Sequence, residues 1–178
     1  MTSLRRGLFV GRFQPFHLGH LHAIKEALKK VDELVIVVGS AQYSHELENP
    51  FTAGERVAMI RAALEEAGIP CSRYLIIPVQ DAPYHMVWVP QVVGFTPPFD
   101  VVFSNEPLTR RLFIEANYKV EEIPFYKRKL CNATEIRRLM IEDGEWEDSL
   151  PSSVCKIIKE IDGVKRLKDL TKTDKPRS

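Results

Sequence analysis

Two histidines one helical turn apart carry the clearest chemistry in this sequence. Residues 11–20 read GRFQPFHLGH, in which His17 and His20 flank Gly19 where a helix-periodic segment begins. The first N–H groups of a helix are unpaired and lie at the positive end of its dipole, so this junction can bind a phosphate group. Gly19 lets a ligand approach the backbone closely, and Arg12 adds a fixed positive charge. Two surface histidines on an amphipathic helix, or two zinc ligands, are the alternatives. The zinc reading is disfavoured because residues 8–23 contain no Asp, Glu or Cys.

A second candidate anion site opens the helix expected after Cys131. Asn132 or Thr134 can cap that helix and leave further N–H groups free for an anion. Arg137 lies early enough in the helix to reach the same anion with two parallel hydrogen bonds. Arg138 is expected to be a solvated neighbour. The alternative is a plain capped helix with two solvated arginines.

A third group follows the strand expected at 74–79. Asp81 comes at the carboxyl end of this strand, and Trp88 can lie over the same cleft seven residues later. An aromatic face favours a cationic ring, and a carboxylate can balance the charge of that ring. Ser40 and Gln42, which follow the preceding strand, are weaker candidates for the same cleft. A core tryptophan beside a helix-capping aspartate is the alternative.

Short apolar runs alternate with helix-periodic segments along the chain. Strands are expected at 8–10, 34–38, 74–79, 101–103 and 119–123, and helices at 19–30, 52–68, 84–95, 108–116, 132–143 and 154–161. The spacings Thr52-x-x-Glu55 and Asn132-x-x-Glu135 predict capping boxes at the starts of two of these helices. This order predicts an α/β fold in which a doubly wound parallel sheet is covered by helices on both faces. Ligands of such sheets bind beyond the carboxyl ends of the strands, where the candidate groups above fall.

Composition limits the class of protein. The chain has 178 residues with 25 Lys and Arg against 24 Asp and Glu, a net charge of +1. We expect one domain over residues 1–170, helical from about 132, and a disordered polar tail at 171–178. A neutral chain disfavours a nucleic-acid binder, and no run of apolar residues predicts a signal peptide or a membrane span. Three cysteines without a C-x-x-C pair predict free thiols in the cytoplasm.

The first junction also carries a family resemblance. The sequence His17-Leu18-Gly19-His20 matches the H-x-G-H motif of the nucleotidyltransferase superfamily, and GRFQPFHLGH is similar to nicotinamide-nucleotide adenylyltransferases of the archaeal type. The resemblance continues in the family's order at residues 39–42, 49–56, 78–81, 88 and 133–138. It implies a Rossmann-like nucleotidyltransferase fold and transfer of the AMP part of ATP to nicotinamide mononucleotide (NMN), giving NAD and pyrophosphate. It further implies Mg²⁺ held by the ATP phosphates rather than by the protein, and a homo-oligomer, for example a hexamer.

The resemblance assigns roles to the candidates. Four residues are expected at the reacting phosphates: His17, His20, Arg12 and Arg137. We expect these residues to gather positive charge locally at the two helix N-termini. Those expected to bind ATP are Gly11, Phe13, Gly19, Asn132 and Thr134. Those expected around nicotinamide are Asp81, Trp88, Ser40 and Gln42.

The chain also departs from the family pattern, and alternatives stay open. Asn132 stands where the family usually has Ser. Residues 46–48 read ELE where relatives often carry a basic residue that reaches phosphate, and the basic run 126–129 is a candidate substitute. A nucleotidyltransferase for pantetheine phosphate or glycerol phosphate, or a non-catalytic nucleotide sensor, are the rival functions. The choice between nicotinamide and nicotinate mononucleotide is not readable from these residues.

Overall fold

A five-stranded parallel sheet forms the centre of the protein. We describe it from a computed structural model, in which residues 4–124, 126 and 132–173 are described. The strands are β1 (Arg6–Gly11), β2 (Glu33–Val38), β3 (Tyr74–Pro78), β4 (Val101–Phe103) and β5 (Val120–Glu121). Every pair is parallel and the spatial order is β3-β2-β1-β4-β5. The chain therefore reverses its direction of travel across the sheet between β1 and β4, which confirms the expected doubly wound fold.

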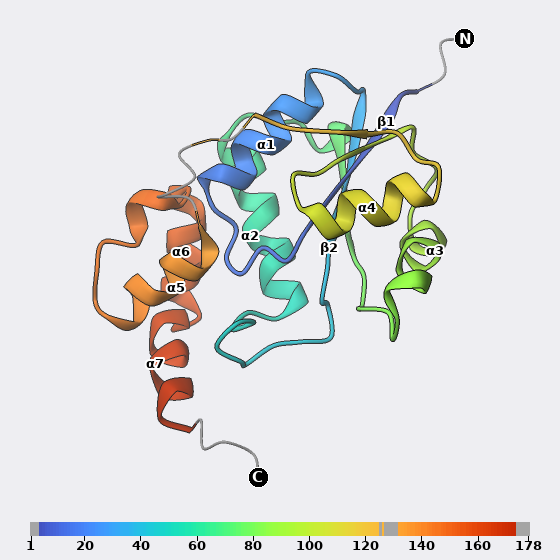
Figure 1. The fold of residues 1–178 in the computed structure, drawn as a ribbon. Coiled ribbons are helices and arrows are strands. Elements are labelled where there is room, and N and C mark those ends of the chain that lie inside the picture. Colours follow the sequence, from blue (N-terminus) through green and yellow to red (C-terminus); the bar gives the residue numbers. More distant parts are fainter. Residues whose placement is uncertain (1–3, 125, 127–131, 174–178) are drawn as a thin grey trace.

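Helices cover both faces of this sheet (Figure 1). They are α1 (Leu18–Leu28), α2 (Ala53–Glu66), α3 (His85–Phe95), α4 (Pro107–Glu115), α5 (Ala133–Ile141), α6 (Ser152–Glu160) and α7 (Gly163–Thr173), with short 3₁₀ turns η1 (Cys71–Arg73) and η2 (Glu147–Ser149). None of the helices in the described part of the chain is long and apolar enough to cross a membrane.

The alternation of side chains along the strands divides the core into two layers. In β2, Leu34, Ile36 and Val38 face the core shared with α1, α2 and α5–α7, whereas Val35 and Val37 face the core shared with α3 and α4. All five side chains are buried, as expected for a strand covered on both faces. The continuous apolar sequence of β2 follows from this double burial.

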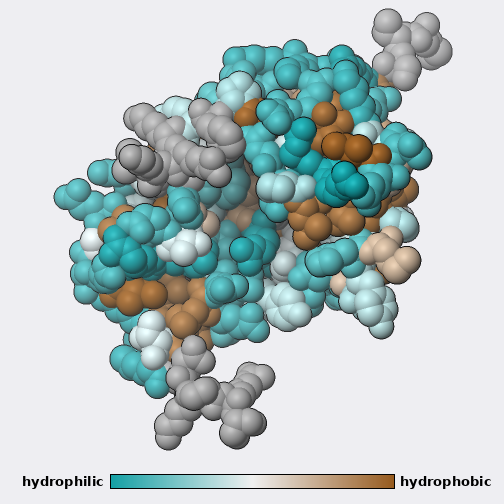
Figure 2. Space-filling view, in the orientation of Figure 1, coloured by the Kyte–Doolittle hydropathy of each residue, from teal (hydrophilic) through white to brown (hydrophobic). Residues whose placement is uncertain are grey.

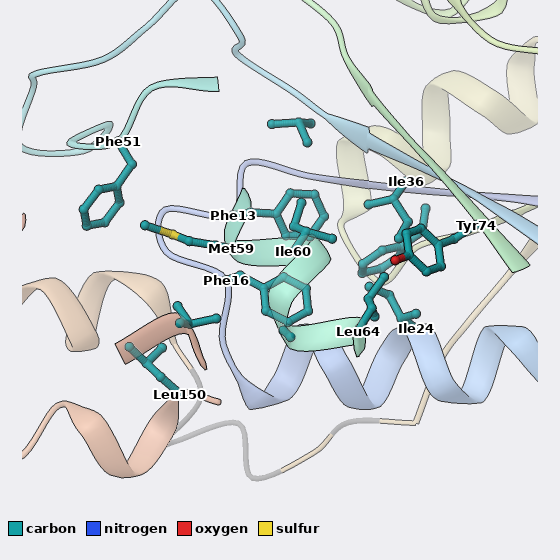
Figure 3. Packing of buried hydrophobic residues seen from close by; sticks show 14 of the residues in the cluster. Phe13, Phe16, Ile24, Ile36, Phe51, Met59, Ile60, Leu64, Tyr74 and Leu150 are labelled. Carbon is teal, nitrogen blue, oxygen red and sulfur yellow. The ribbon is translucent and has the colours of Figure 1, made fainter. Parts of the chain in front are cut away.

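The loop between β1 and α1 is anchored in the larger core by two phenylalanines. Figure 3 shows Phe13 and Phe16 among side chains of α2, including Met59 and Ile60. Phe13 is 1% exposed and Phe16 is fully buried. The loop that carries the histidine motif is therefore fixed by its own apolar residues.

The helix starts are only partly as expected. Thr52 and Glu55 form the expected capping box of α2, each side chain accepting from the other's backbone N–H. Asn132 caps α5 by accepting from the N–H of Thr134, but Glu135 pairs with Arg138 instead of closing a box. The capping box expected at 132–135 is therefore wrong in its second half.

The C-terminal segment holds a helix that sequence analysis did not predict. α7 runs through residues 171–173, so the polar tail expected from residue 171 is wrong for these three positions. Its Arg166 donates to both carboxylate oxygens of Glu55 and to the carbonyl of Pro50. α7 is thus tied to the beginning of α2 and to the loop before it.

Candidate active site

His17 and His20 form a capping box at the start of α1. His17 is the N-cap, and its Nδ1 accepts from the backbone N–H of His20 at 3.3 Å. In return, the Nδ1 of His20 accepts from the backbone N–H of His17 at 3.2 Å. The two rings stack with centroids 3.6 Å apart and planes 20° apart. The spacing H-x-x-H therefore caps the start of α1.

This geometry determines where the imidazole protons lie. Since both Nδ1 atoms accept hydrogen bonds, each neutral ring carries its proton on Nε2 and can donate it outward. Burial lowers the pKa of His17 to about 4. The pKa of His20 is also lowered, first by burial and then by the neighbouring His17. In the ligand-free protein both histidines are therefore neutral N–H donors at neutral pH, and the expected positive charge around a bound triphosphate stays a prediction.

A cavity of about 380 Å³ opens beside these histidines, and we call it the histidine cavity. It is lined by His17, Gly19 and His20 of the first junction and by Asn132 and Ala133 at the start of α5. The two helix N-termini expected to bind anions thus meet at one cavity. The loop after β4, residues 104–106, closes another side of it.

The Phe13 side chain packs against His20 from the core side and does not line this cavity. Its ring lies edge-on to the ring of His20, with centroids 4.8 Å apart. Phe13 has a positive φ of 53°, and a Cβ at Gly11 would lie 2.8 Å from the Phe13 ring. Gly11 therefore makes room for Phe13. The Phe13 side chain is outside the linings of this cavity and of the larger one beyond the ends of β1, β2 and β3, and its expected part in ATP binding stays a prediction.

Arg137 is a buried cation held by neutral oxygens. It is 7% exposed, its Nη1 donates to the carbonyl of Gln14 at 2.8 Å, and its Nη2 donates to the Thr134 hydroxyl at 3.5 Å. No carboxylate of the described residues forms an ion pair with it. Burial lowers the pKa of Arg137, as does the nearby charge of Arg12. Neither Arg137 nor Thr134 lines the histidine cavity, although they lie in the helix that begins there.

A second, larger cavity of about 650 Å³ lies beyond the ends of β1, β2 and β3, and we call it the Trp88 cavity. Five expected residues line it: Gly11, Arg12, Ser40, Asp81 and Trp88. It also shares Val10 and Glu106 with the histidine cavity. The two cavities therefore adjoin between β1 and β4, where the order of the sheet reverses and ligands of such folds bind.

The polar groups of the Trp88 cavity are fixed by one another. Asp81 Oδ1 accepts from the backbone N–H of Ser40 at 3.2 Å and from its hydroxyl at 3.0 Å. The N–H of Asp81 donates to Gln42 Oε1 at 3.0 Å. Gln42 is outside both cavity linings and holds the backbone of Asp81 in place; its expected contact with nicotinamide stays a prediction. The half-buried Trp88 ring packs edge-on against Phe113, with centroids 5.6 Å apart.

Comparison with known proteins agrees with this geometry. The cytidylyltransferase-like family matches residues 8–139. A nicotinamide-nucleotide adenylyltransferase of Methanolobus tindarius is 51% identical over 172 residues, covering 97% of this chain and 98% of that protein. One of Archaeoglobus fulgidus is 54% identical over 173 residues, covering 95% and 99%. This chain belongs to the family of nicotinamide-nucleotide adenylyltransferases.

Solved structures of adenylyltransferases have the same fold. A bifunctional NMN adenylyltransferase/ADP ribose pyrophosphatase from Francisella tularensis has a TM-score of 0.78 and 25% identity over 94% of this chain. This chain spans about half, 53%, of that longer protein. A putative nicotinate-nucleotide adenylyltransferase from Vibrio parahaemolyticus has a TM-score of 0.61 at 15% identity, which supports the fold alone.

This adenylyltransferase also holds its site with a residue to which sequence analysis gave no role. Arg56 is fully buried in α2. Its Nη1 donates to the carbonyls of Arg12 and Gly39, and its Nη2 to that of Ser40, at 2.8–3.1 Å. Burial lowers the pKa of Arg56 to about 10. In the sequence, Arg56 lies on the same face of α2 as the apolar residues Met59 and Ile60. A charged residue on an apolar helix face was the signal that could have indicated its buried role.

Gln14 is a second such positioning residue, at 2% exposure. Its side-chain amide pairs with the backbone of Phe51 in both directions, at 2.9 and 3.0 Å. Its own carbonyl is the acceptor that holds Arg137. Gln14 therefore links the loop before α2 to the arginine of α5. Its place inside the string GRFQPFHLGH gave no indication of this role.

Proposed function

We propose that this protein transfers the adenylyl group of ATP to NMN, giving NAD and pyrophosphate. The observation that carries the proposal is the pair of adjoining cavities at the switch point of the sheet. One has neutral N–H donors and helix N-termini suited to phosphates, and the other has an aromatic ring and a carboxylate suited to a cationic base. Two nucleotides bound in these cavities would bring their phosphates together near Val10 and Glu106.

The reaction needs positioning more than proton transfer. A phosphate oxygen of NMN attacks the α-phosphorus of ATP in line, the bond to the β-phosphate oxygen breaks, and pyrophosphate leaves with its electron pair. We assign His17 and His20 to the α- and β-phosphates, where their Nε2–H groups donate as negative charge builds up on the phosphoryl oxygens. Arg137 acts at the β- and γ-phosphates, and Arg12 reduces the repulsion between the two anions. The backbone N–H groups at the starts of α1 and α5 that are not used in capping donate to the same phosphates.

The Trp88 cavity suits nicotinamide in charge and shape. The ring of NMN is a pyridinium cation, which stacks favourably on an aromatic face. Asp81 has one oxygen bound by Ser40, and its other oxygen has no hydrogen bond to a described residue, so it can accept from the amide N–H₂. A nicotinate carboxylate would instead face the negative charge of Asp81. We therefore infer a preference for nicotinamide over nicotinate mononucleotide.

A divalent cation enters with the substrate in this scheme. Mg²⁺ binds oxygen ligands and is commonly held through nucleotide phosphates rather than by a protein cage. A related Francisella tularensis structure is described as complexed with AMP and an Mn ion. The cation neutralises charge on the departing pyrophosphate.

Self-association is the remaining part of the proposal. The helix α3 is apolar on most sides and exposes Met86 (81%) and Phe95 (61%), with Tyr84 (70%) just before it. In Figure 2 hydrophobic side chains gather on the side of the molecule that carries α3 and α4. Such a patch favours a homo-oligomer, and a hexamer is the form we expect.

The free thiols of Cys71 and Cys155 fit a cytoplasmic protein.

A substrate comparison tests the function. Purified protein is incubated with ATP and Mg²⁺ and with one acceptor at a time: NMN, nicotinate mononucleotide, pantetheine phosphate or glycerol phosphate. Pyrophosphate release is measured for each. We expect the highest kcat/KM with NMN, a lower one with nicotinate mononucleotide, and no product with the other two. ATP binding without pyrophosphate from any acceptor would instead indicate a nucleotide sensor.

A further inference from the structure

A carboxylate faces the cations that we assign to the phosphates. Glu48 Oε2 lies 3.9 Å from Nη1 of Arg12. Its negative charge also acts on the buried guanidinium of Arg137, which has no ion pair among the described residues. Both members of the Arg12–Glu48 pair are exposed, at 54% and 78% of their side-chain surface. Glu48 is therefore placed to balance the two arginines while no nucleotide is bound.

The turn that carries Glu48 is held by hydrogen bonds between its first and last residues, Glu46 and Asn49. The backbones of Glu46 and Asn49 exchange two hydrogen bonds, at 3.2 and 3.1 Å. The Asn49 side chain donates to the Glu46 carboxylate at 3.3 Å. Asn49 is buried, and Phe51, two residues later, is paired with Gln14. The base of the turn is therefore held in place, while the Glu48 side chain at its tip can rotate away.

We propose that Glu48 is the internal competitor of the substrate phosphates and so sets the affinity of the site for ATP and pyrophosphate. The proposal rests on the proposed function, because it takes Arg12 and Arg137 as phosphate contacts. An exposed ion pair is weak and screened by water, so a polyanion displaces the carboxylate at small cost. The same carboxylate returns when pyrophosphate leaves, which keeps product from being held too tightly.

The size of the effect follows from the exposure of the pair. Exposed ion pairs of this kind typically change an equilibrium by about 1.5- to 5-fold. Replacement of Glu48 by Gln keeps the shape and removes the charge. We therefore expect E48Q to bind pyrophosphate and ATP about 2- to 5-fold more tightly than the wild type. NMN affinity should rise less, because NMN brings a single phosphate to Arg12, which lines the Trp88 cavity, whereas ATP and pyrophosphate bring several.

The test measures binding and inhibition together. Calorimetric titration with Mg²⁺–pyrophosphate gives Kd for the wild type, E48Q and the control E160Q. Glu160 lies 3.9 Å from Lys156 in an exposed ion pair on α6, outside both cavities, so E160Q matches the charge change. KM for ATP and Ki for pyrophosphate are then measured in the NAD-forming assay, and circular dichroism checks folding.

We expect Kd, Ki and KM for ATP to fall in E48Q and to stay at wild-type values in E160Q. Unchanged or weaker pyrophosphate binding in E48Q overturns the proposal, and weaker binding would indicate that Glu48 helps to hold the metal–phosphate complex. An equal fall in both variants also overturns it, since net charge alone would then explain the effect. A wild-type protein that makes no NAD refutes the proposed function instead, and the titration still decides the role of Glu48.

Discussion

Burial of His17 makes the stability of the ligand-free protein depend on pH in a direction that the structure determines. The N-cap role needs a lone pair on Nδ1, and burial lowers the pKa of the ring to about 4 from 6.5. Replacement of His17 by Asn keeps a capping acceptor, because Asn is among the favoured N-cap residues, but removes the titration. Comparison of wild type and His17→Asn therefore reports the proton bound by this ring together with its effect on the neighbouring His20.

The magnitude follows from the two pKa values. Between the unfolded value of 6.5 and the folded value of about 4, the unfolded chain binds more protons than the folded one. The free energy of unfolding therefore falls as the pH is lowered through this window, and is unaffected above it. Each pH unit in the window costs about 1.4 kcal/mol. The wild type should lose about 2 kcal/mol between pH 6.5 and pH 5, and about 3 kcal/mol once the pH is below 4.

Urea unfolding followed by tryptophan fluorescence measures this effect at about pH 7.5, 6.5 and 5. Groups away from this junction titrate alike in both proteins, so the quantity of interest is the difference between them, which includes the effect of His17 on His20. We expect the wild type to lose about 2 kcal/mol more than His17→Asn. His45→Asn, at an exposed histidine of the loop before α2, should behave like the wild type. Identical pH dependence in wild type and His17→Asn would refute the buried, neutral His17.

Four further substitutions test the site and its support. Arg137→Gln removes the buried cation and should lower kcat/KM by about 10²–10³. Gln14→Ala removes the support of Arg137 and should lower kcat/KM by a smaller factor. Both values are measured in the pyrophosphate assay. Trp88→Ala should raise KM for NMN by roughly 2- to 30-fold, the range of a lost cation–π contact, while KM for ATP stays near its wild-type value. Arg166→Ala breaks the pair with Glu55 and should lower the free energy of unfolding by about 2 kcal/mol, seen as a lower urea midpoint.

The strands and most helices could be predicted because their signals are local. β2 is buried on both faces, so its sequence is an unbroken apolar run. The spacing of Thr52 and Glu55 alone indicates the start of α2. α7 was missed because what holds it is distant in the sequence. Arg166 meets Glu55 across 111 residues, and its polar surroundings resemble a solvated tail.

The candidate site was predicted in its members better than in their roles. His17, His20, Asn132, Asp81 and Trp88 all line the two cavities, as their positions after strands and at helix starts indicated. Their charge state depends on burial, which a sequence does not state.

The roles of the remaining members depend on long-range packing. Phe13 supports His20, Gln42 orients Asp81, and Arg56 joins the ends of two strands. Each of these contacts is set by which segments the fold brings together. Residue type and spacing therefore identified the segments, and only the packing distinguished contact residues from supporting ones.

The fate of the ATP phosphates tests the central claim most directly. Protein, Mg²⁺ and NMN are incubated with ATP labelled at the α-phosphate in one reaction and at the γ-phosphate in another, and the products are separated. Adenylyl transfer places the α label in NAD and the γ label in pyrophosphate, in equal amounts. Label in AMP or orthophosphate, or no transfer to NMN, would contradict adenylyl transfer by this site.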